Sequence, residues 1–210
     1  IVGFVFIIPF IYFVSTSRIK KNEIYKYVIV MLLAGLQARM GWIMVASGLE
    51  DRVFVAPLKL MLHLLFATVL LILVYRLALE NLSPPKIRLY KKNMRGWLTF
   101  LIFFIILQIC LGGLVAGARA ALAYPTWPKM GVAWVPNNLF TLQPLWLNFV
   151  ENLATIHFVH RTVAYLLVIF VFILIIRGAR LSASNAFHKG RLYLLIGVTV
   201  QLVLGVITLV

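Results

Sequence analysis

Charged residues, acidic residues and cysteines are all scarce in this chain. Only 12% of its 210 residues are charged, and Asp and Glu together number 5 against 20 Lys and Arg. Hydrophobic residues make up 63%, whereas a soluble domain has nearer half, and the mean hydropathy is +1.03. This composition excludes an ordinary soluble domain and indicates a polytopic membrane protein, so the first expected partner is the lipid bilayer.

The single cysteine and the excess of bases each exclude a class of function. Cys110 lies inside an apolar run, so the chain has neither an intramolecular disulfide nor a CxxC metal or redox site. The formal charge of +15 could suggest a nucleic-acid partner, but that needs a basic face with readout groups. The bases here fall mostly in short loops between apolar runs, so we expect no nucleic acid and interpret the charge as topological.

Six apolar segments predict six membrane helices, at residues 1–14, 28–47, 59–79, 97–118, 153–176 and 192–210. The first is shorter than the roughly 20 residues that a span needs. The chain also starts and stops inside apolar runs, so we expect a fragment cut at both ends. The sequence therefore predicts part of a larger all-α membrane protein.

The loops alternate between base-rich and base-poor. Loops 15–27, 80–96 and 177–191 hold four, five and four Lys or Arg, whereas loops 49–58 and 119–152 hold one and two. By the positive-inside rule the base-rich loops face the cytoplasm or the mitochondrial matrix. The expected location is the bacterial cytoplasmic membrane or the mitochondrial inner membrane, with multiple passes.

The most informative stretch is ENLATIHFVHR, residues 151–161, which runs directly into the fifth apolar segment. Ionisable groups at the mouth of a membrane helix are costly and call for a specific reason. A neutral imidazole is a good axial ligand for haem iron, and Arg161 beside His160 suits a haem propionate. One alternative is that His157 and His160 only hydrogen-bond neighbouring helices. Zinc is a weaker alternative, because an HxxH pair does not fill a tetrahedral site.

Two histidines share a predicted depth in the membrane. His63 and His160 both fall near the outer ends of their segments, beneath the Trp- and Pro-rich loop 119–152. Two ligands at one depth would suit a cofactor layer near the outer surface. A chance agreement in depth is the alternative, since intramembrane ionisable residues are not always ligands.

A short repeat, QxxxG, recurs in three segments, at Gln37–Gly41, Gln108–Gly112 and Gln201–Gly205. Gly permits close helix approach and Gln can hydrogen-bond across an interface, which is typical of helix packing. Gln37 precedes His63 by 26 residues. If Gln201 is the counterpart of Gln37 in a second half, the counterpart of His63 would fall 26 residues after Gln201, near position 227. His160 precedes Gln201 by 41 residues, which places its own counterpart before Ile1.

The repeat therefore implies four histidine ligands, two of them in this chain. It predicts two four-helix units, each with two histidines from different helices, as bundle cores commonly hold haem. We expect an N-terminal unit at residues 1–79, a cytoplasmic linker at 80–96 and a C-terminal unit at 97–210, both units being incomplete.

Four strings carry a family resemblance: LQARMGWIMVASGLEDR (36–52), LVAG (114–117), LAYPTWPKM (122–130) and ENLATIHFVHR (151–161). Together they resemble haem A synthase in its mitochondrial and alphaproteobacterial form. The resemblance implies an eight-helix membrane protein of two pseudo-symmetric four-helix bundles. It also implies an oxidoreductase that converts the C8 methyl of haem O to the formyl group of haem A for cytochrome oxidase.

The resemblance also implies roles for single residues. His160 matches an axial ligand of a resident haem b, with Arg161 as its propionate partner, and His63 matches an iron ligand on the side of the substrate haem O. We therefore take His63 as the candidate catalytic residue and His157 as a group that supports a ligand. The family's first histidine and a catalytic Glu would precede Ile1. Haem O synthase is a further expected partner, and the electron donor is left open.

Two other functions compete with this one. A di-haem b-type cytochrome, carrying electrons to or from quinone, fits a set of histidine pairs equally well. A transporter would have helices interrupted near the midplane, and these segments are largely continuous.

Overall fold

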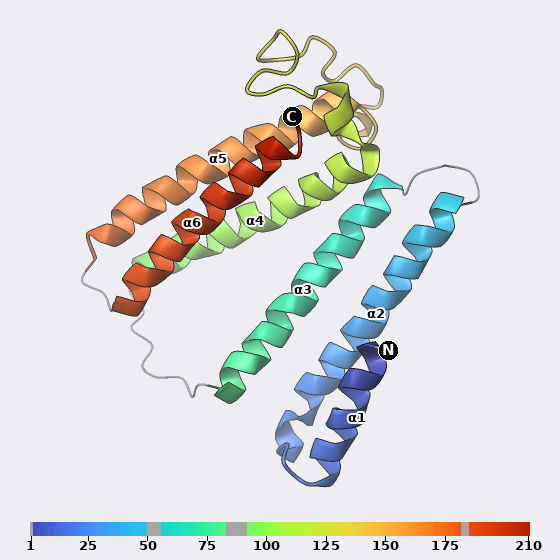
Figure 1. Ribbon diagram of the computed structural model, residues 1–210, viewed down its shortest axis with the longest axis vertical. Helices are drawn as coiled ribbons and strands as arrows, with labels where there is room; N and C mark the ends of the chain where they lie inside the picture. The colour runs from blue at the N-terminus through green and yellow to red at the C-terminus, as the bar shows by residue number, and fades with distance from the viewer. Residues whose placement is uncertain (1, 50–55, 83–91, 182–184) are drawn as a thin grey trace. The chain divides into compact units, whose positions relative to one another are not determined.

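The computed structural model describes residues 2–49, 56–82, 92–181 and 185–210, and within these ranges the chain is helical, with no β-strand. The described ranges contain six α-helices, and Figure 1 labels them and shows the long connection between the fourth and the fifth. They are α1 (Val2–Ser15), α2 (Ile24–Leu49), α3 (Pro57–Leu82), α4 (Lys92–Ala118), α5 (Leu153–Ala179) and α6 (Asn185–Ile207). The predicted all-α class is confirmed.

Five of these helices, α2 to α6, are long and apolar enough to cross a membrane. The shorter α1 has 14 residues and is apolar throughout. Each of the six predicted segments corresponds to one helix, so the chain is a multi-pass membrane protein. Many large apolar side chains are exposed on these helices, which is expected where lipid tails rather than protein surround them.

The helices extend further than their apolar runs. The predicted loop 177–191 was too long, because α5 continues to Ala179 and α6 already begins at Asn185, which puts Lys189 and Arg191 on a helix. Long basic side chains can reach the headgroup region from a helix end, so such residues need not end a helix. Both ends of the predicted linker 80–96 are likewise helical, and its residues 83–91 lie outside the described ranges.

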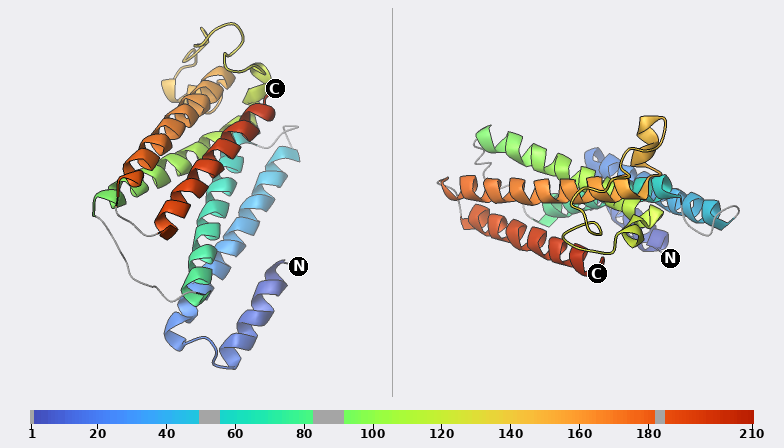
Figure 2. Two further views of the ribbon diagram at one scale, coloured as in Figure 1. Left: turned by 60° about the vertical axis from the view of Figure 1, so that its left-hand side comes forward. Right: turned by 90° about the horizontal axis from the view of Figure 1, so that it is seen from above.

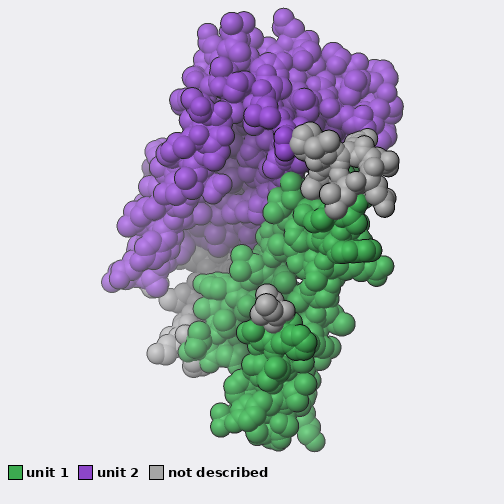
Figure 3. Space-filling view, turned by 45° about the vertical axis from the view of Figure 1, so that its right-hand side comes forward, with its two compact units in different colours: residues 1–89 green, residues 90–210 purple. Residues whose placement is uncertain are grey.

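The chain divides into two compact units, residues 1–89 and 90–210, coloured separately in Figure 3. In the first unit α2 and α3 run side by side, as both Figure 1 and Figure 2 show. α1 packs against the start of α2, where the rings of Phe10 and Tyr27 lie 6.2 Å apart.

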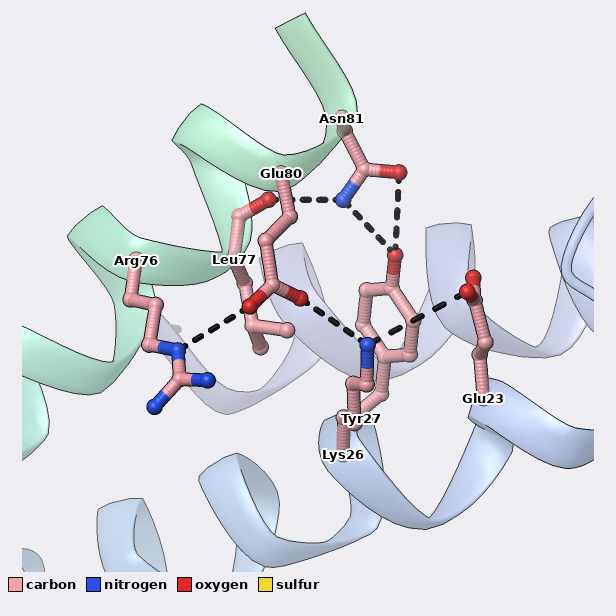
Figure 4. A network of polar contacts seen from close by, with 7 residues as sticks. All are labelled: Glu23, Lys26, Tyr27, Arg76, Leu77, Glu80 and Asn81. Atoms are coloured by element: carbon pink, nitrogen blue, oxygen red, sulfur yellow. Dashed lines mark hydrogen bonds and ion pairs between the residues drawn. The ribbon is translucent and has the colours of Figure 1, made fainter. Parts of the chain in front are cut away.

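A polar clasp joins the start of α2 to the end of α3 (Figure 4). The Glu80 carboxylate accepts from Lys26 Nζ at 2.9 Å and from Arg76 Nε at 3.0 Å. Asn81 Nδ2 donates to the Tyr27 hydroxyl at 3.1 Å. These side chains are partly to largely exposed, so the clasp adds little stability to the α2–α3 pair.

In the second unit α5 packs against both α4 and α6, the helices shown in Figure 2. A small apolar core lies among them. Leu101, Val171 and Leu174 form its centre. Beside it the rings of Trp97 and Phe170 stack at 5.3 Å. This core holds α4, which carries Gln108, against α5, which carries His160 and Arg161.

Candidate functional site

The start of α5 is set by a capping asparagine. Asn152 Oδ1 accepts from the backbone N–H groups of Ala154 at 3.0 Å and Thr155 at 3.2 Å. Such a cap satisfies N–H groups that have no partner inside the helix. The helix therefore begins at Leu153, as the sequence predicted, and this start places His157, His160 and Arg161 in its second and third turns.

The connection between α4 and α5 folds back over this helix start, as Figure 1 shows. Asn148 is fully buried; its Nδ2 donates to the carbonyls of Leu142 and Leu145, and its Oδ1 accepts from the Leu142 N–H. The Phe140 N–H donates to the Thr155 hydroxyl at 3.2 Å. These hydrogen bonds hold the connection, residues 119–152, over the end of the α4–α5 pair, and we call this segment the cap.

Arg161 ties α5 to this cap. Its side chain is 8% exposed, and its Nε donates to His157 Nε2 at 2.9 Å. Its other nitrogens donate to three loop carbonyls, of Lys129 at 3.3 Å, Tyr124 at 3.1 Å and Thr126 at 2.8 Å. These contacts use four of the five N–H donors of a guanidinium. A propionate role for Arg161 stays a prediction, and the contacts seen here are with the loop.

His157 is equally enclosed, at 3% exposed. Its Nε2 accepts from Arg161, so that nitrogen has no lone pair to offer a metal in this arrangement. This is compatible with the predicted supporting role. In the described part of the chain, no three His, Cys, Asp or Glu side chains gather as a metal site would require, which lends no support to zinc.

His160 points instead to α4. Gln108 Nε2 lies 3.1 Å from His160 Nδ1 and 3.3 Å from His160 Nε2, and it also donates to the His160 carbonyl. One turn along α4, a Cβ added to Gly112 would come within 3.4 Å of the imidazole Cε1. The imidazole therefore rests against the Gln–Gly face of α4.

His63 has the same surroundings in the first unit. Gln37 Nε2 on α2 lies 3.2 Å from His63 Nε2, and a Cβ added to Gly41 would come within 3.1 Å of the imidazole Cε1. His63 Nδ1 is buried without a hydrogen-bond partner among the residues that the structure describes.

Sequence reasoning noticed the QxxxG repeat but interpreted it as helix packing. It linked Gln37 to His63 only by counting residues, and it missed the contact of Gln108 with His160. The available signal was that Gln and Gly four residues apart share one helix face, so a side chain seated over the Gly also meets the Gln.

Comparison with known proteins decides the family. All of residues 1–210 match the COX15-CtaA family, cytochrome oxidase assembly protein. The chain belongs to this family. It is 39% identical over 208 residues to the "Heme A synthase" of Wolbachia pipientis from Culex pipiens, strain wPip, a match that covers 99% of this chain and 61% of that protein.

Two other COX15-CtaA relatives, also named "Heme A synthase", are 36% identical to the chain. That of Azorhizobium caulinodans matches over 212 residues, 100% of this chain and 60% of that protein, and that of Brucella ovis over 209 residues, 99% and 58%. The chain thus spans about three fifths of the length of these relatives, and the predicted family resemblance is confirmed. No solved structure matches the chain.

The side chains present fit the haem that this family membership suggests. Each unit offers one imidazole on a glycine face, and in each the facing glutamine leaves its Oε1 buried without a partner among the described residues. Buried polar atoms without partners are unusual unless a ligand or water completes them. A site with two axial imidazoles would draw the second from elsewhere in the protein.

Proposed function

We propose that this chain belongs to a haem A synthase, a membrane oxidoreductase that converts the C8 methyl of haem O to the formyl group of haem A. The observation that carries the proposal is the identity of 36–39% with heme A synthases over almost the whole chain. Two half-buried histidines, one in each unit, support it, because each lies against a Gln and a Gly of the neighbouring helix.

In this proposal the two histidines have different tasks. His160 binds a resident haem b in the second unit, and His63 is the catalytic residue that binds the substrate haem O in the first. When bound, haem supplies the electron-transfer and oxygen chemistry, while the protein binds and orients it. The polar cap held by Asn148 and Arg161 covers the helix end near His160 and limits the access of water.

In this proposal a second imidazole for each haem would be supplied by segments outside residues 1–210. At the third QxxxG, a Cβ added to Gly205 on α6 would meet nothing within 4 Å among the residues that the structure describes, as also holds for Gly190 and Gly197. That face has room for an imidazole like those seated on Gly41 and Gly112. We place this third imidazole near position 227, by the same count of residues that separates Gln37 from His63.

The proposed membrane is the bacterial cytoplasmic membrane or the mitochondrial inner membrane, with the base-rich loops on the cytoplasmic or matrix side. Haem O synthase, which makes the substrate, is the proposed partner there. Substrate passed between the two enzymes would avoid crossing water.

The test is pigment analysis of the full-length protein expressed with a haem O synthase. The proposal predicts haem A and residual haem O in the extract, together with haem B that copurifies with the protein. A His63→Ala variant is the matched control and should yield haem O without haem A. Extracts that contain only haem B would instead favour the di-haem b-type cytochrome, and protein without haem would favour histidines that merely join helices.

A further inference from the structure

The glutamines that face the two histidines have no task in the proposed function. Gln37 and Gln108 lie on α2 and α4, in different units, and each places its amide nitrogen within 3.3 Å of an imidazole nitrogen on the next helix. In both cases the glycine four residues later lies against the same imidazole carbon, Cε1. A glutamine and a glycine four residues apart thus hold an imidazole twice, and we call this arrangement a seat. It occurs twice although the two histidines are separated from their glutamines by 26 and 52 residues.

Each seat controls how the imidazole is rotated. The glycine lets the edge of the ring approach the helix backbone, and the amide then lies beside the ring nitrogens on that edge. A buried amide inside a membrane helix is costly unless it is paired, and in both seats the imidazole is the partner found.

Each seat can also control the tautomer. As placed, the amide NH₂ can only donate, so His63 Nε2 accepts from Gln37, and one of the two His160 ring nitrogens accepts from Gln108. The amide oxygens, Gln37 Oε1 and Gln108 Oε1, are buried and have no partner among the described residues. Rotation about the last side-chain torsion exchanges the oxygen and the nitrogen without any shift of the helices. The amide can then accept from a ring N–H.

An imidazole that ligates a metal through one nitrogen carries its proton on the other, and that N–H usually has an acceptor that fixes the ring and raises its basicity. We propose that Gln37 and Gln108 are positioning residues that fix the rotation and tautomer of His63 and His160 as haem ligands. The inference rests on the proposed function, since it assumes that both histidines bind haem iron.

The test compares Gln108→Leu and Gln108→Glu in the full-length haem-loaded protein. Leucine removes the acceptor, so the midpoint potential of the haem bound by His160 becomes more positive, the ferric low-spin EPR signal shifts, and haem affinity falls by roughly 10–100-fold. Glutamate is a stronger acceptor, so the potential becomes more negative and the haem is retained. If amide packing were the only role, the two variants would shift the potential in the same direction or leave it unchanged.

Cys110→Ala is the control, because it alters α4 two residues away on the opposite helix face. It should leave the EPR signal and the potential as in the unmodified protein.

If Gln108→Leu does not fold, the shift in Gln108→Glu decides alone, and a potential that is unchanged or more positive in that variant overturns the inference. If the unmodified protein holds haem and makes haem A, but neither substitution changes the midpoint potential or the EPR signal, only the positioning role is refuted. Unmodified protein without haem refutes the proposed function and this inference together.

Discussion

Arg161 donates its Nε–H to Nε2 of His157, one helical turn earlier on α5, at 2.9 Å. The pair is buried, and the rest of the guanidinium is bound to the carbonyls of Tyr124, Thr126 and Lys129. A cation buried at the end of a membrane helix thus holds a loop in place by hydrogen bonds to backbone oxygens. Since the adjacent His160 faces the other way, toward Gln108, the loop and the proposed haem ligand are fixed by neighbouring residues of one helix.

Arg161→Ala should loosen the cap. Three loop carbonyls lose their donor, which we expect to cost about 1–3 kcal/mol of local stability. The measurement is hydrogen–deuterium exchange of the full-length protein, which should be faster across residues 124–130. The exposed Arg180→Ala is the control and should leave exchange there unchanged. Equal exchange in both variants would contradict this role for Arg161.

Haem retention separates Arg161 from its neighbour His160. His160 is the proposed source of an iron bond, whereas Arg161 supplies hydrogen bonds, so His160→Ala should lose more haem than Arg161→Ala. The haem content per protein after purification measures this. An equal or larger loss from the Arg161 variant would place Arg161 nearer to the haem than we propose.

Asn148→Ala should disrupt the fold of the loop. Asn148 is fully buried and joins the backbone of Leu142 and Leu145, so its removal breaks three hydrogen bonds that hold the loop. We expect a loss of about 1–3 kcal/mol, seen as faster proteolysis of the loop. Asn137→Ala changes an exposed residue of the same type and should have little effect. Matching proteolysis rates in the two variants would refute this prediction.

Gly41→Ala should impair function more than Gly35→Ala on the same helix. A Cβ at position 41 would come within 3.1 Å of the His63 imidazole, whereas at position 35 it would meet no atom of the described residues within 4 Å. Small displacements of a reacting group lower rates steeply, so we expect the yield of haem A to fall by up to roughly tenfold in Gly41→Ala. Gly35→Ala should match the unmodified protein. A tolerated alanine at position 41 would mean that the seat does not constrain His63.

Topology can be tested by cysteine labelling in a Cys110→Ala background. Ser17, in a base-rich loop, and Val132, 95% exposed in the base-poor connection, are each replaced by Cys. The positive-inside rule predicts that a membrane-impermeant thiol reagent added to intact cells labels position 132 and not position 17. The reverse pattern would invert the proposed orientation.

The helices could be predicted from sequence, and so could the placement of His63 and His160 on two of them, whereas their role as haem ligands stays a prediction. Long apolar runs have few alternatives in a bilayer, where every backbone group needs an internal partner. A histidine inside such a run is conspicuous for the same reason.

The contacts around the histidines could not be predicted in this way. The partners of Arg161 are mostly backbone carbonyls, which carry no sequence signal, and their position depends on how the loop folds onto α5. The pairing of Gln108 with His160 spans 52 residues and depends on how α4 packs against α5. The limits of α6 were wrong because Lys189 and Arg191 were taken as loop residues, although a helix end tolerates them.

The most direct test of the account compares His63→Ala and His160→Ala in the full-length protein expressed with a haem O synthase. Copurified haem B and the conversion of haem O to haem A are measured in the same preparations. We predict that His160→Ala loses most of its haem B, because a haem without one axial ligand is held less firmly. His63→Ala should keep most of its haem B and form no haem A. If both variants lose haem B equally and activity follows haem content alone, the two histidines do not have separate tasks, and a protein that carries electrons through two haems explains the site better.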